Sequence, residues 1–409
     1  MNPPNKLEDR GPLNIAFLIT SMPIGGAETL LVNLMRRLDP ARICPQVICL
    51  KEKGPLGEQI ADEFKVHSDL IRHRYDIGIV PRLQRIFAEQ RIDGIVTVGA
   101  GDKMFWGRLA ARAAKLPVIV SALHSTGWPD GVGRANRLLT RFTDAFIAVA
   151  HAHGRFLVEF ERFPVAKVEV IPNGIDTERF QFSVNSRQEL RQQWGWDNDT
   201  PVCGVVAALR PEKNLCLFLQ SAAQVVQNLG KAGFVIVGTG PEEERLRAEA
   251  DRLGIMEHVR FLGARHDIPE VLSGLDLFAL TSDNEASPVS ILEAMSTQLP
   301  VVCTDVGSVR ESVVEGETGM VVPVGQVEPM AAAWTQLLSD PMTSKNYGRQ
   351  GRQRVVETNS LDSMTEGYQT LLESIYQSKA KGTQFMTQSV CQLLDAGSPQ
   401  KEEPVPVNS

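Results

Sequence analysis

Short apolar runs alternate with amphipathic segments of helix length from residue 13 to about residue 357 of this chain. The runs are nearly continuous in Val and Ile, as in parallel strands that are buried on both faces of a sheet. Strands are predicted at residues 14–20, 46–50, 94–98, 117–121, 145–149, 168–171, 202–207, 233–237, 259–262, 277–281, 300–304 and 319–322. Open twisted sheets rarely exceed about ten strands. The pattern therefore predicts an α/β protein with two doubly wound parallel-sheet domains rather than one sheet of twelve strands.

The boundary between the two domains is predicted at residues 171–176, Ile-Pro-Asn-Gly-Ile-Asp. Pro-Asn-Gly favours a turn, and a polar stretch at 181–200 follows it. The length of 409 residues agrees with two or three domains of about 150 residues each. We expect a first domain at 1–176, a second at 184–358 and a last helix at about 359–377. The polar tail at 378–409, which ends rich in proline, is expected to be disordered.

Composition excludes several classes of protein. The chain is 43% hydrophobic and 22% charged, as in ordinary soluble domains. Its apolar runs fall short of the ~18–20 residues of a membrane span, and residues 1–10 lack the apolar core of a signal peptide, so a cytoplasmic location is expected. Six scattered cysteines without a Cys-x-x-Cys pair favour neither structural zinc nor disulfides. A net charge of −7 disfavours broad nucleic-acid binding.

The charge is unevenly distributed along the chain. Residues 1–176 carry a net charge of +4 and residues 177–409 a net charge of −11. Part of the basic excess lies in two groups, one of Arg72, Arg74, Arg82 and Arg85 and one of Arg134, Arg137 and Arg141. The second group shares a predicted helical face with Leu138, Leu139 and Phe142. This face is either simply solvated, or it contacts anionic lipid or a phosphorylated acceptor.

The segment 282–300 carries the most informative chemistry. A strand ends before it, and Ser287 followed by Pro288 predicts a helix with Ser287 at the N-cap and Pro288 at the first helical position. The free amides at a helix start suit a phosphate. Glu285 and Glu293 flank this start; carboxylates repel an anion, so they suit the neutral hydroxyls of a ribose and a sugar beside it. The alternative is two solvated surface glutamates.

These residues resemble a known site. The segment is similar to the nucleotide-sugar site of retaining GT-B glycosyltransferases of family 4. The similarity lies in Glu285, followed after seven residues by Glu293-Ala294-Met295, and in the Pro-Val-Val sequence at 300–302. Further landmarks follow in the family's order: GGAE at 25–28, IPNGID at 171–176, LRPEKN at 209–214, VGTGP at 237–241 and FLG at 261–263. The resemblance covers about residues 13–377. It implies a GT-B fold, two Rossmann-like domains that face each other across a cleft, with the last helix crossing back onto the first domain.

The resemblance also assigns residues of the donor site. It implies that Glu293 holds the ribose hydroxyls and that Glu285 contacts the donor sugar. The backbone of four residues is expected near the sugar and diphosphate: Ala286, Ser287, Pro288 and Val289. Arg265 is expected near the base. Gly238 is expected mainly to shape a strand-to-helix turn, with a modest nucleotide contact.

The leaving diphosphate needs a cation, because negative charge develops on it as the glycosyl bond breaks. Lys213 is the best candidate. Family members pair this lysine with an arginine five residues earlier, where this chain has Ala208; Arg210 is the possible substitute. Alternatively, Lys213 is simply an exposed lysine at the start of a helix.

Three residues of the first half are expected to face the second domain. Gly25 and Gly26 follow the first strand; they form either a tight turn or, as the resemblance implies, a loop that approaches the donor phosphate or the acceptor. His124 follows a strand at the carboxyl edge, where doubly wound sheets bind ligands. It is either a structural histidine or a partner of the donor sugar.

The predicted function is transfer of a sugar from a nucleotide-diphosphate-sugar donor to an acceptor hydroxyl, with retention of the anomeric configuration, in cell-envelope polysaccharide or glycolipid synthesis. The acceptor is expected to be a saccharide or lipid-linked. No metal or other cofactor is expected, because Lys213 and a helix start stand in place of an Asp-x-Asp cluster. The alternatives are a sugar-nucleotide epimerase or hydrolase of the same fold, and a non-catalytic nucleotide-sugar-binding partner, which Ala208 favours. A dehydrogenase is disfavoured because no Gly-x-Gly-x-x-Gly follows the first strand.

Overall fold

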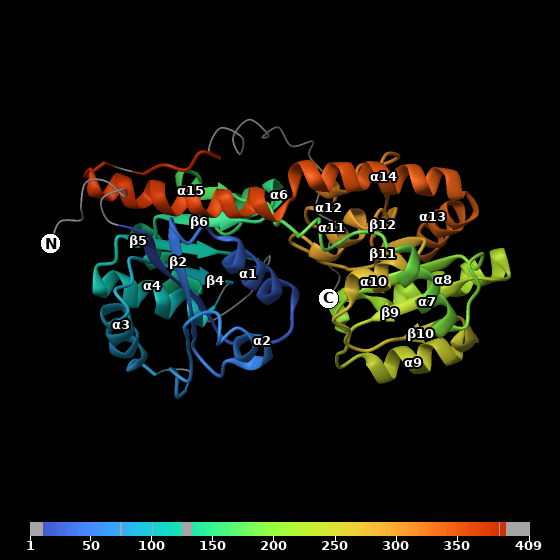
Figure 1. Ribbon diagram of the computed structural model, residues 1–409, viewed down its shortest axis with the longest axis horizontal. Helices are drawn as coiled ribbons and strands as arrows, with labels where there is room; N and C mark the ends of the chain where they lie inside the picture. The colour runs from blue at the N-terminus through green and yellow to red at the C-terminus, as the bar shows by residue number, and fades with distance from the viewer. Residues whose placement is uncertain (1–10, 74–75, 100, 125–132, 384, 390–409) are drawn as a thin grey trace.

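The computed structural model describes residues 11–73, 76–99, 101–124, 133–383 and 385–389. Their strands form two sheets, one of seven strands in the order β3-β2-β1-β4-β5-β6-β7 and one of six in the order β10-β9-β8-β11-β12-β13. Every registered strand pair is parallel. Figure 1 shows the two sheets in separate lobes side by side, each with helices around it. The predicted α/β fold with two doubly wound parallel sheets is confirmed.

The first lobe contains β1 to β7 and the helices between them. Its strands are β1 Leu13–Ile19, β2 Ile43–Cys49, β3 Val66–His67, β4 Gly94–Val98, β5 Val118–Ala122, β6 Ala145–Ala148 and β7 Val168–Val170. Its helices are α1 Gly26–Arg37, α2 Gly54–Gln59, α3 Ile79–Glu89, α4 Asp102–Ala114, α5 Gly133–Leu139 and α6 His151–Glu159, with 3-10 turns at Thr140–Phe142 and Val165–Lys167. The two-residue strand β3 was not predicted, because two residues give no periodicity.

The second lobe contains β8 to β13. Its strands are β8 Val202–Val206, β9 Gly233–Val237, β10 Val259–Phe261, β11 Leu277–Leu280, β12 Val301–Thr304 and β13 Gly319–Val322. Its helices are α7 Val184–Trp194, α8 Leu215–Leu229, α9 Glu243–Arg252, α10 Ile268–Ser273, α11 Val289–Ser296, α12 Val309–Ser312, α13 Val327–Ser339 and α14 Pro341–Thr358. Two 3-10 turns lie at Pro211–Lys213 and Met256–His258.

Burial on both faces explains the nearly continuous apolar runs. In β1, Ile15 and Phe17 join the core beneath α1, whereas Ala16 and Leu18 join the core that includes α3 and α4. The second sheet is covered in the same way, by α8, α9 and α13 on one face and by α7, α10, α11 and α14 on the other. Successive side chains of a strand point to opposite faces, so a strand covered on both sides must be apolar at every position.

The chain crosses between the lobes twice. The segment after β7 runs into the second lobe, and the chain returns through α15, Leu361–Ala380. The two crossings pair directly, because Ile175 N donates to Asn359 O and Leu361 N donates to Ile175 O, both at 2.9 Å. In Figure 1 α15 lies over the first lobe, although α14 before it belongs to the second. Leu372 and Ile375 bury α15 in the core of the first lobe, and Arg42 pairs with Glu373 at 2.7 Å.

Two predictions of local structure were wrong. Helix α11 begins at Val289 with Pro288 at the N-cap and no side-chain cap, so Ser287 is not the N-cap. Pro288 has ψ 110, an extended conformation, which delays the helix by one residue. Disorder was predicted from residue 378, yet α15 continues to Ala380, and Ser389 Oγ accepts a 2.9 Å bond from Val170 N. The rest of the predicted disordered tail, residues 390–409, lies outside the described residues.

Candidate active site

Lys213 and Glu285 meet beyond the carboxyl ends of β8 and β11. Lys213 ends the 3-10 turn Pro211–Lys213, and its Nζ donates to Glu285 Oε1 at 2.5 Å. Ser282 Oγ donates to the same oxygen at 2.7 Å. The Glu285 side chain is only 10% exposed. Both donors use Oε1, and Oε2 has no partner among the described residues, so it is available to a hydroxyl of a ligand.

The backbone of the loop at 285–288, called the donor loop below, is fixed by contacts from its neighbours. Gly307 lies in the left-handed region at φ +55, and a Cβ there would stand 1.7 Å from Glu285 O. Ser308 Oγ donates to Ala286 O at 2.5 Å, and Asn173 Nδ2 donates to Ser287 O at 3.2 Å. Because the carbonyls of Ala286 and Ser287 are hydrogen-bonded, the backbone of the loop is held in a single conformation where it enters α11. The free amides of the first turn then carry partial positive charge at a defined place.

Glu293 lies one turn inside α11, at its half-buried side. Burial raises the pKa of its carboxyl to about 7, and the nearby Arg179 opposes that shift. A carboxyl in this state gains from hydrogen bonds donated by neutral hydroxyls, which favour its ionised form. This environment agrees with a site for a polyol such as a ribose.

The structure separates Arg210 from Lys213. The Arg210 side chain is 64% exposed, and its nearest acid is Glu212 at 4.0 Å. It does not join the contacts at Glu285. Burial raises the pKa of Glu28 in the first lobe, and the charge of Arg210 is near enough to oppose that shift. Thus Lys213 alone supplies a side-chain cation beside Glu285 among the described residues.

The start of α1 in the first lobe lies within electrostatic reach of Arg210 of the second lobe. Gly25 is the N-cap of α1, and a Cβ there would stand 2.5 Å from Glu28 Oε2. A Cβ at Gly26 would meet nothing within 4 Å. Burial raises the pKa of Glu28, and Lys103 and Arg210 oppose the shift. Gly26 is thus exposed and borders open space, and Glu28 two residues later is within electrostatic reach of cations from both lobes.

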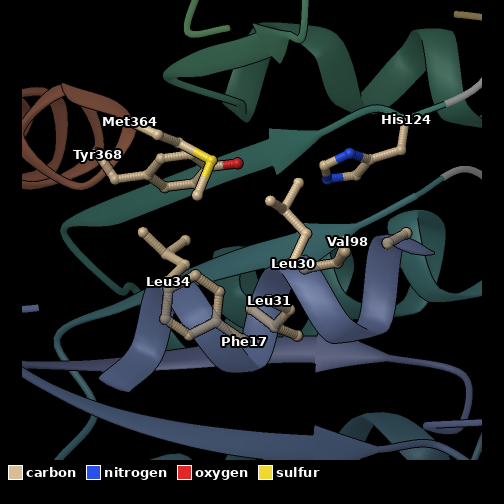
Figure 2. Close-up of a pocket in the computed structure, with 9 residues that line it drawn as sticks. Phe17, Leu30, Leu31, Leu34, Val98, His124, Met364 and Tyr368 are labelled. Atoms are coloured by element: carbon tan, nitrogen blue, oxygen red, sulfur yellow. The ribbon is translucent and has the colours of Figure 1, made fainter. Parts of the chain in front are cut away.

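His124 follows β5 and lines a small pocket with α1 and α15. Figure 2 shows its ring directed toward Leu30, with Met364 and Tyr368 of α15 at the far end. Burial lowers the pKa of His124 to about 4, and His153 and Lys103 add to the shift. The imidazole is therefore neutral at pH 7 and can donate one hydrogen bond and accept another.

Two predicted nucleotide contacts are engaged within the second lobe. Arg265 forms a two-point ion pair with Asp267, with Nε donating to Oδ1 at 2.8 Å. Gly238 has φ +132, and a Cβ there would lie 1.9 Å from Ala207 O. Its amide donates to Gly263 O at 2.8 Å. Packing alone thus requires glycine at 238.

The two basic groups of the first lobe differ in their partners. In the first group Arg82 pairs with Asp76 at 2.9 Å and Arg85 with Glu89 at 2.7 Å. In the second group Arg137 is exposed, and Arg141 lies over the Phe142 ring at 4.4 Å. The neighbouring Leu138 is 73% exposed. The side chains of Arg74 and Arg134 lie outside the described residues.

Sequence reasoning missed several residues of this site. The sequence motif at 25–28 includes Glu28, but no role was predicted for it. No role was predicted for Lys103, Ser282 or Gly307 either. An acid in the first turn of α1 after two glycines was a usable signal for Glu28. Gly307 had no local signal, because its contact with Glu285 O joins positions 22 residues apart.

A chain with two Rossmann-like lobes, joined by a pair of crossings and with polar groups at the strand ends, has the architecture of a two-domain nucleotide-binding enzyme. Comparison with known families makes this specific. The family model "Glycosyl transferases group 1" matches residues 186–354, and "Glycosyltransferase Family 4" matches residues 24–179. The chain belongs to the GT-B glycosyltransferases, and the predicted enzyme class is confirmed.

Curated relatives agree with this assignment. A UDP-Gal:alpha-D-GlcNAc-diphosphoundecaprenol alpha-1,3-galactosyltransferase of Escherichia coli is 26% identical over 313 residues, 72% of this chain and 80% of the relative. A GDP-mannose-dependent alpha-(1-6)-phosphatidylinositol monomannoside mannosyltransferase of Mycolicibacterium smegmatis is 29% identical over 287 residues, 67% of this chain and 74% of the relative. These matches do not favour the epimerase, hydrolase or non-catalytic alternatives.

Solved structures share the fold. HepE of Anabaena, in complex with UDP and glucose, superposes with a TM-score of 0.79 at 23% identity and covers 88% of this chain and 100% of its own. WaaG, a glycosyltransferase involved in lipopolysaccharide biosynthesis, superposes with a TM-score of 0.69 at 17% identity and covers 88% and 99%. The GT-B fold is thus supported independently of the sequence landmarks.

Proposed function

We propose that this glycosyltransferase transfers a hexose from a nucleotide-diphosphate sugar to a hydroxyl of a saccharide or lipid-linked acceptor of the cell envelope, with retention of anomeric configuration. The observation that carries the proposal is the convergence of Lys213 and Ser282 on Glu285, at a loop whose backbone is held by Gly307 and Ser308. The two relatives above use UDP-galactose and GDP-mannose with lipid-linked acceptors.

The donor is proposed to bind on the second lobe. Glu293 accepts hydrogen bonds from the ribose hydroxyls, and Glu285 Oε2 accepts one from the sugar. The amides at 286–289 face the sugar and the diphosphate. Arg265 and Gly238 border the base, which the relatives leave open between uridine and guanosine.

Lys213 is proposed to stabilise the leaving group. Its Nζ pairs with Glu285, four residues before α11 begins, and both sources of positive charge are proposed to act on the diphosphate. As the bond from the anomeric carbon to the diphosphate oxygen breaks, negative charge develops there, and a preorganised cation lowers the barrier. We propose that Lys213 and the helix start supply this charge without a metal ion. Added EDTA should then leave the rate unchanged.

Transfer is proposed to occur on one face of the sugar. The acceptor oxygen bonds to the anomeric carbon on the face that the diphosphate leaves, and the acceptor proton passes to a departing phosphate oxygen. Neutral His124, near the start of α1, is proposed to hydrogen-bond a sugar hydroxyl. Gly25 and Gly26 are proposed to border the diphosphate or the acceptor, and of the two only Gly26 has open space beside it.

The direct test combines a panel of nucleotide sugars with an undecaprenyl-diphosphate-linked GlcNAc acceptor. We expect nucleoside diphosphate release that depends on the acceptor, and a product whose new linkage has the donor's anomeric configuration by NMR. Release without acceptor would identify a hydrolase, and an inverted linkage would refute the one-face mechanism. A thermal-shift panel of UDP-, GDP- and ADP-sugars identifies the base, because a specific ligand raises Tm.

We further propose that the second basic group contacts anionic membrane from the first lobe. Arg137 and Leu138 are exposed together on α5, and Arg112 and Arg141 flank the Phe142 ring at 4.9 and 4.4 Å. No helix within the described ranges is long and apolar enough to cross a membrane. The double variant R137S/L138S should reduce co-sedimentation with phosphatidylglycerol vesicles, whereas R85S, which removes an arginine paired with Glu89, should not. Equal binding by both variants would refute this surface.

A further inference from the structure

Glu311, on the short helix α12 of the second lobe, contacts the first lobe. Its Oε2 accepts a hydrogen bond from His151 N at 2.9 Å, and its Oε1 accepts one from Ala152 N at 2.6 Å. These amides are the first two of α6, whose N-cap Ala150 offers no side-chain acceptor. The carboxylate therefore caps a helix of the other lobe, where the amides and the helix dipole both favour negative charge.

The segment that carries Glu311 is also the one that fixes the donor loop. Gly307 fits against Glu285 O, Ser308 Oγ donates to Ala286 O, and α12 begins at the next residue. Arg354 of α14 donates to Glu311 O at 2.7 Å and holds the far side of α12. A shift of Glu311 would thus be transmitted over four residues to the backbone beside Glu285.

On the other side of the contact, the start of α6 lies near His124. His153 is the third residue of α6; it is buried, and its Nδ1 accepts a bond from Val149 N at 3.3 Å. His153 is also close enough to His124 to affect its charge. Glu311 therefore joins the element next to His124 to the segment next to Glu285.

A second tie reaches the donor loop from the crossing segments. Asn173 Nδ2 donates to Ser287 O, and Asn173 O accepts a 3.0 Å bond from Asn359 Nδ2. Asn173 is buried. The donor loop is thus held at Ser287 by the crossings and at Ala286 by the segment that carries Glu311.

We infer that Glu311 is a positioning residue for glycosyl transfer, which sets the distance and orientation between the donor loop and the first lobe by capping α6 across the lobes. The inference rests on the proposed function for its kinetic consequence. Glu311 touches neither donor nor acceptor in this role. Loss of its carboxylate leaves the donor site on the second lobe intact but misaligns it with the groups of the first lobe.

Glu315 provides a matched control. It is the same residue type four positions later, and its carboxylate also accepts a bond from a backbone amide, Val321 N at 2.6 Å, but within the second lobe. Substitution of Glu315 removes a comparable bond without touching the contact between the lobes. A purely structural role of Glu311 would make the two substitutions equivalent.

The experiment compares E311A, E311Q and E315A with the wild type. We expect E311A to lower kcat of transfer by about tenfold or more, with the Kd of the nucleoside diphosphate within threefold. E311Q, which keeps one acceptor oxygen, should fall between E311A and wild type, and E315A should keep the wild-type kcat even if its Tm falls. Small-angle scattering of ligand-free E311A should show a broader spread of lobe separations than E315A.

Equal loss of kcat in E311A and E315A would overturn the inference, as would weaker nucleotide binding with unchanged kcat. If E311A does not fold, the isosteric E311Q decides between these outcomes. If the wild type transfers no sugar, the proposed function fails, whereas the scattering comparison still decides whether Glu311 holds the lobes together.

Discussion

The donor loop of the second lobe and the start of α1 in the first lobe are both glycine-dependent turns after a parallel strand, yet they differ in how tightly they are packed. At the donor loop a Cβ on Gly307 would stand 1.7 Å from Glu285 O, and the loop carbonyls have partners. At α1 a Cβ on Gly26 would meet nothing within 4 Å. The loop that we propose to bind the donor is thus held in place by the chain itself, whereas the start of α1 is open at Gly26.

This difference has a chemical consequence. A preorganised cation and dipole act fully in the transition state only if they do not have to rearrange. Both relatives use a nucleotide sugar, UDP-galactose in one and GDP-mannose in the other, and their acceptors differ as well. A rigid donor side and an open acceptor side would allow one fold to serve different acceptors.

The largest expected effect comes from Lys213→Ala, which tests the preformed side. We expect kcat to fall by about 100- to 1,000-fold with a smaller change in donor KM, because Lys213 acts on charge that develops in the transition state. Steady-state kinetics with the identified donor measure both constants. A variant with wild-type kcat would remove Lys213 from leaving-group stabilisation.

Gly307→Ala and Gly26→Ala form the pair that most directly tests the contrast. Gly307→Ala should lower the free energy of unfolding by about 2–4 kcal/mol, because its Cβ overlaps Glu285 O and its φ is positive. Gly26→Ala should leave stability unchanged or raise it by up to about 1 kcal/mol, since alanine favours a helix. Urea denaturation measures both. Equal destabilisation would mean that the two turns are packed alike.

A ligand effect separates the two glycines further. If the space at Gly26 receives the diphosphate or the acceptor, Gly26→Ala should raise a KM in spite of its unchanged stability. Unchanged kinetics in a stable Gly26→Ala protein would show that this space is not used.

Glu293 makes the donor side depend on pH. Its pKa is about 7 in the folded protein against 4.5 for an ordinary glutamate, so the folded state binds more protons between these values and loses stability as pH rises through them. Glu293→Gln should therefore be more stable than wild type by about 3 kcal/mol at pH 8 and equal to it below pH 4.5. Thermal denaturation at the two pH values measures this.

The same residue should control donor affinity. Because ribose hydroxyls donate to the ionised carboxylate, wild-type affinity for a nucleotide sugar should rise about tenfold between pH 6 and pH 8. Glu293→Gln should bind weakly with a flat pH profile. Calorimetry with the nucleotide sugar avoids the titrating terminal phosphate of a nucleoside diphosphate. A flat wild-type profile would contradict the proposed role.

The smallest effect is expected for Arg210→Ala. The side chain is exposed and lies outside the contacts at Glu285, so its removal should lower kcat by less than about fivefold. A loss of kcat as large as that of Lys213→Ala would show that Arg210 takes the role of the arginine that family members have at the position of Ala208.

Much of the fold could be predicted from the sequence. Three strands were predicted with the bounds that the structure has, because strands covered on both faces are apolar throughout. They are Gly94–Val98, Gly233–Val237 and Gly319–Val322. The start of α11 was predicted one residue early, since the effect of Pro288 on its own backbone outweighed the capping preference of Ser287. Ordered contacts at Gln388 and Ser389 were missed because polar residues bond Glu169 there without any periodic signal.

The sequence by itself determined which residue types stand where a nucleotide sugar could be held: two glutamates, one lysine and glycines after strands. Local pattern carries that information because strand ends and helix starts depend on neighbouring residues. Only the tertiary structure decided that Lys213 meets Glu285, that Arg210 stays outside this contact, and that Glu311 caps a helix of the other lobe. The contacts of Lys213 and Glu311 join residues from 72 to 160 positions apart, and they depend on how the elements of the two lobes are set against each other.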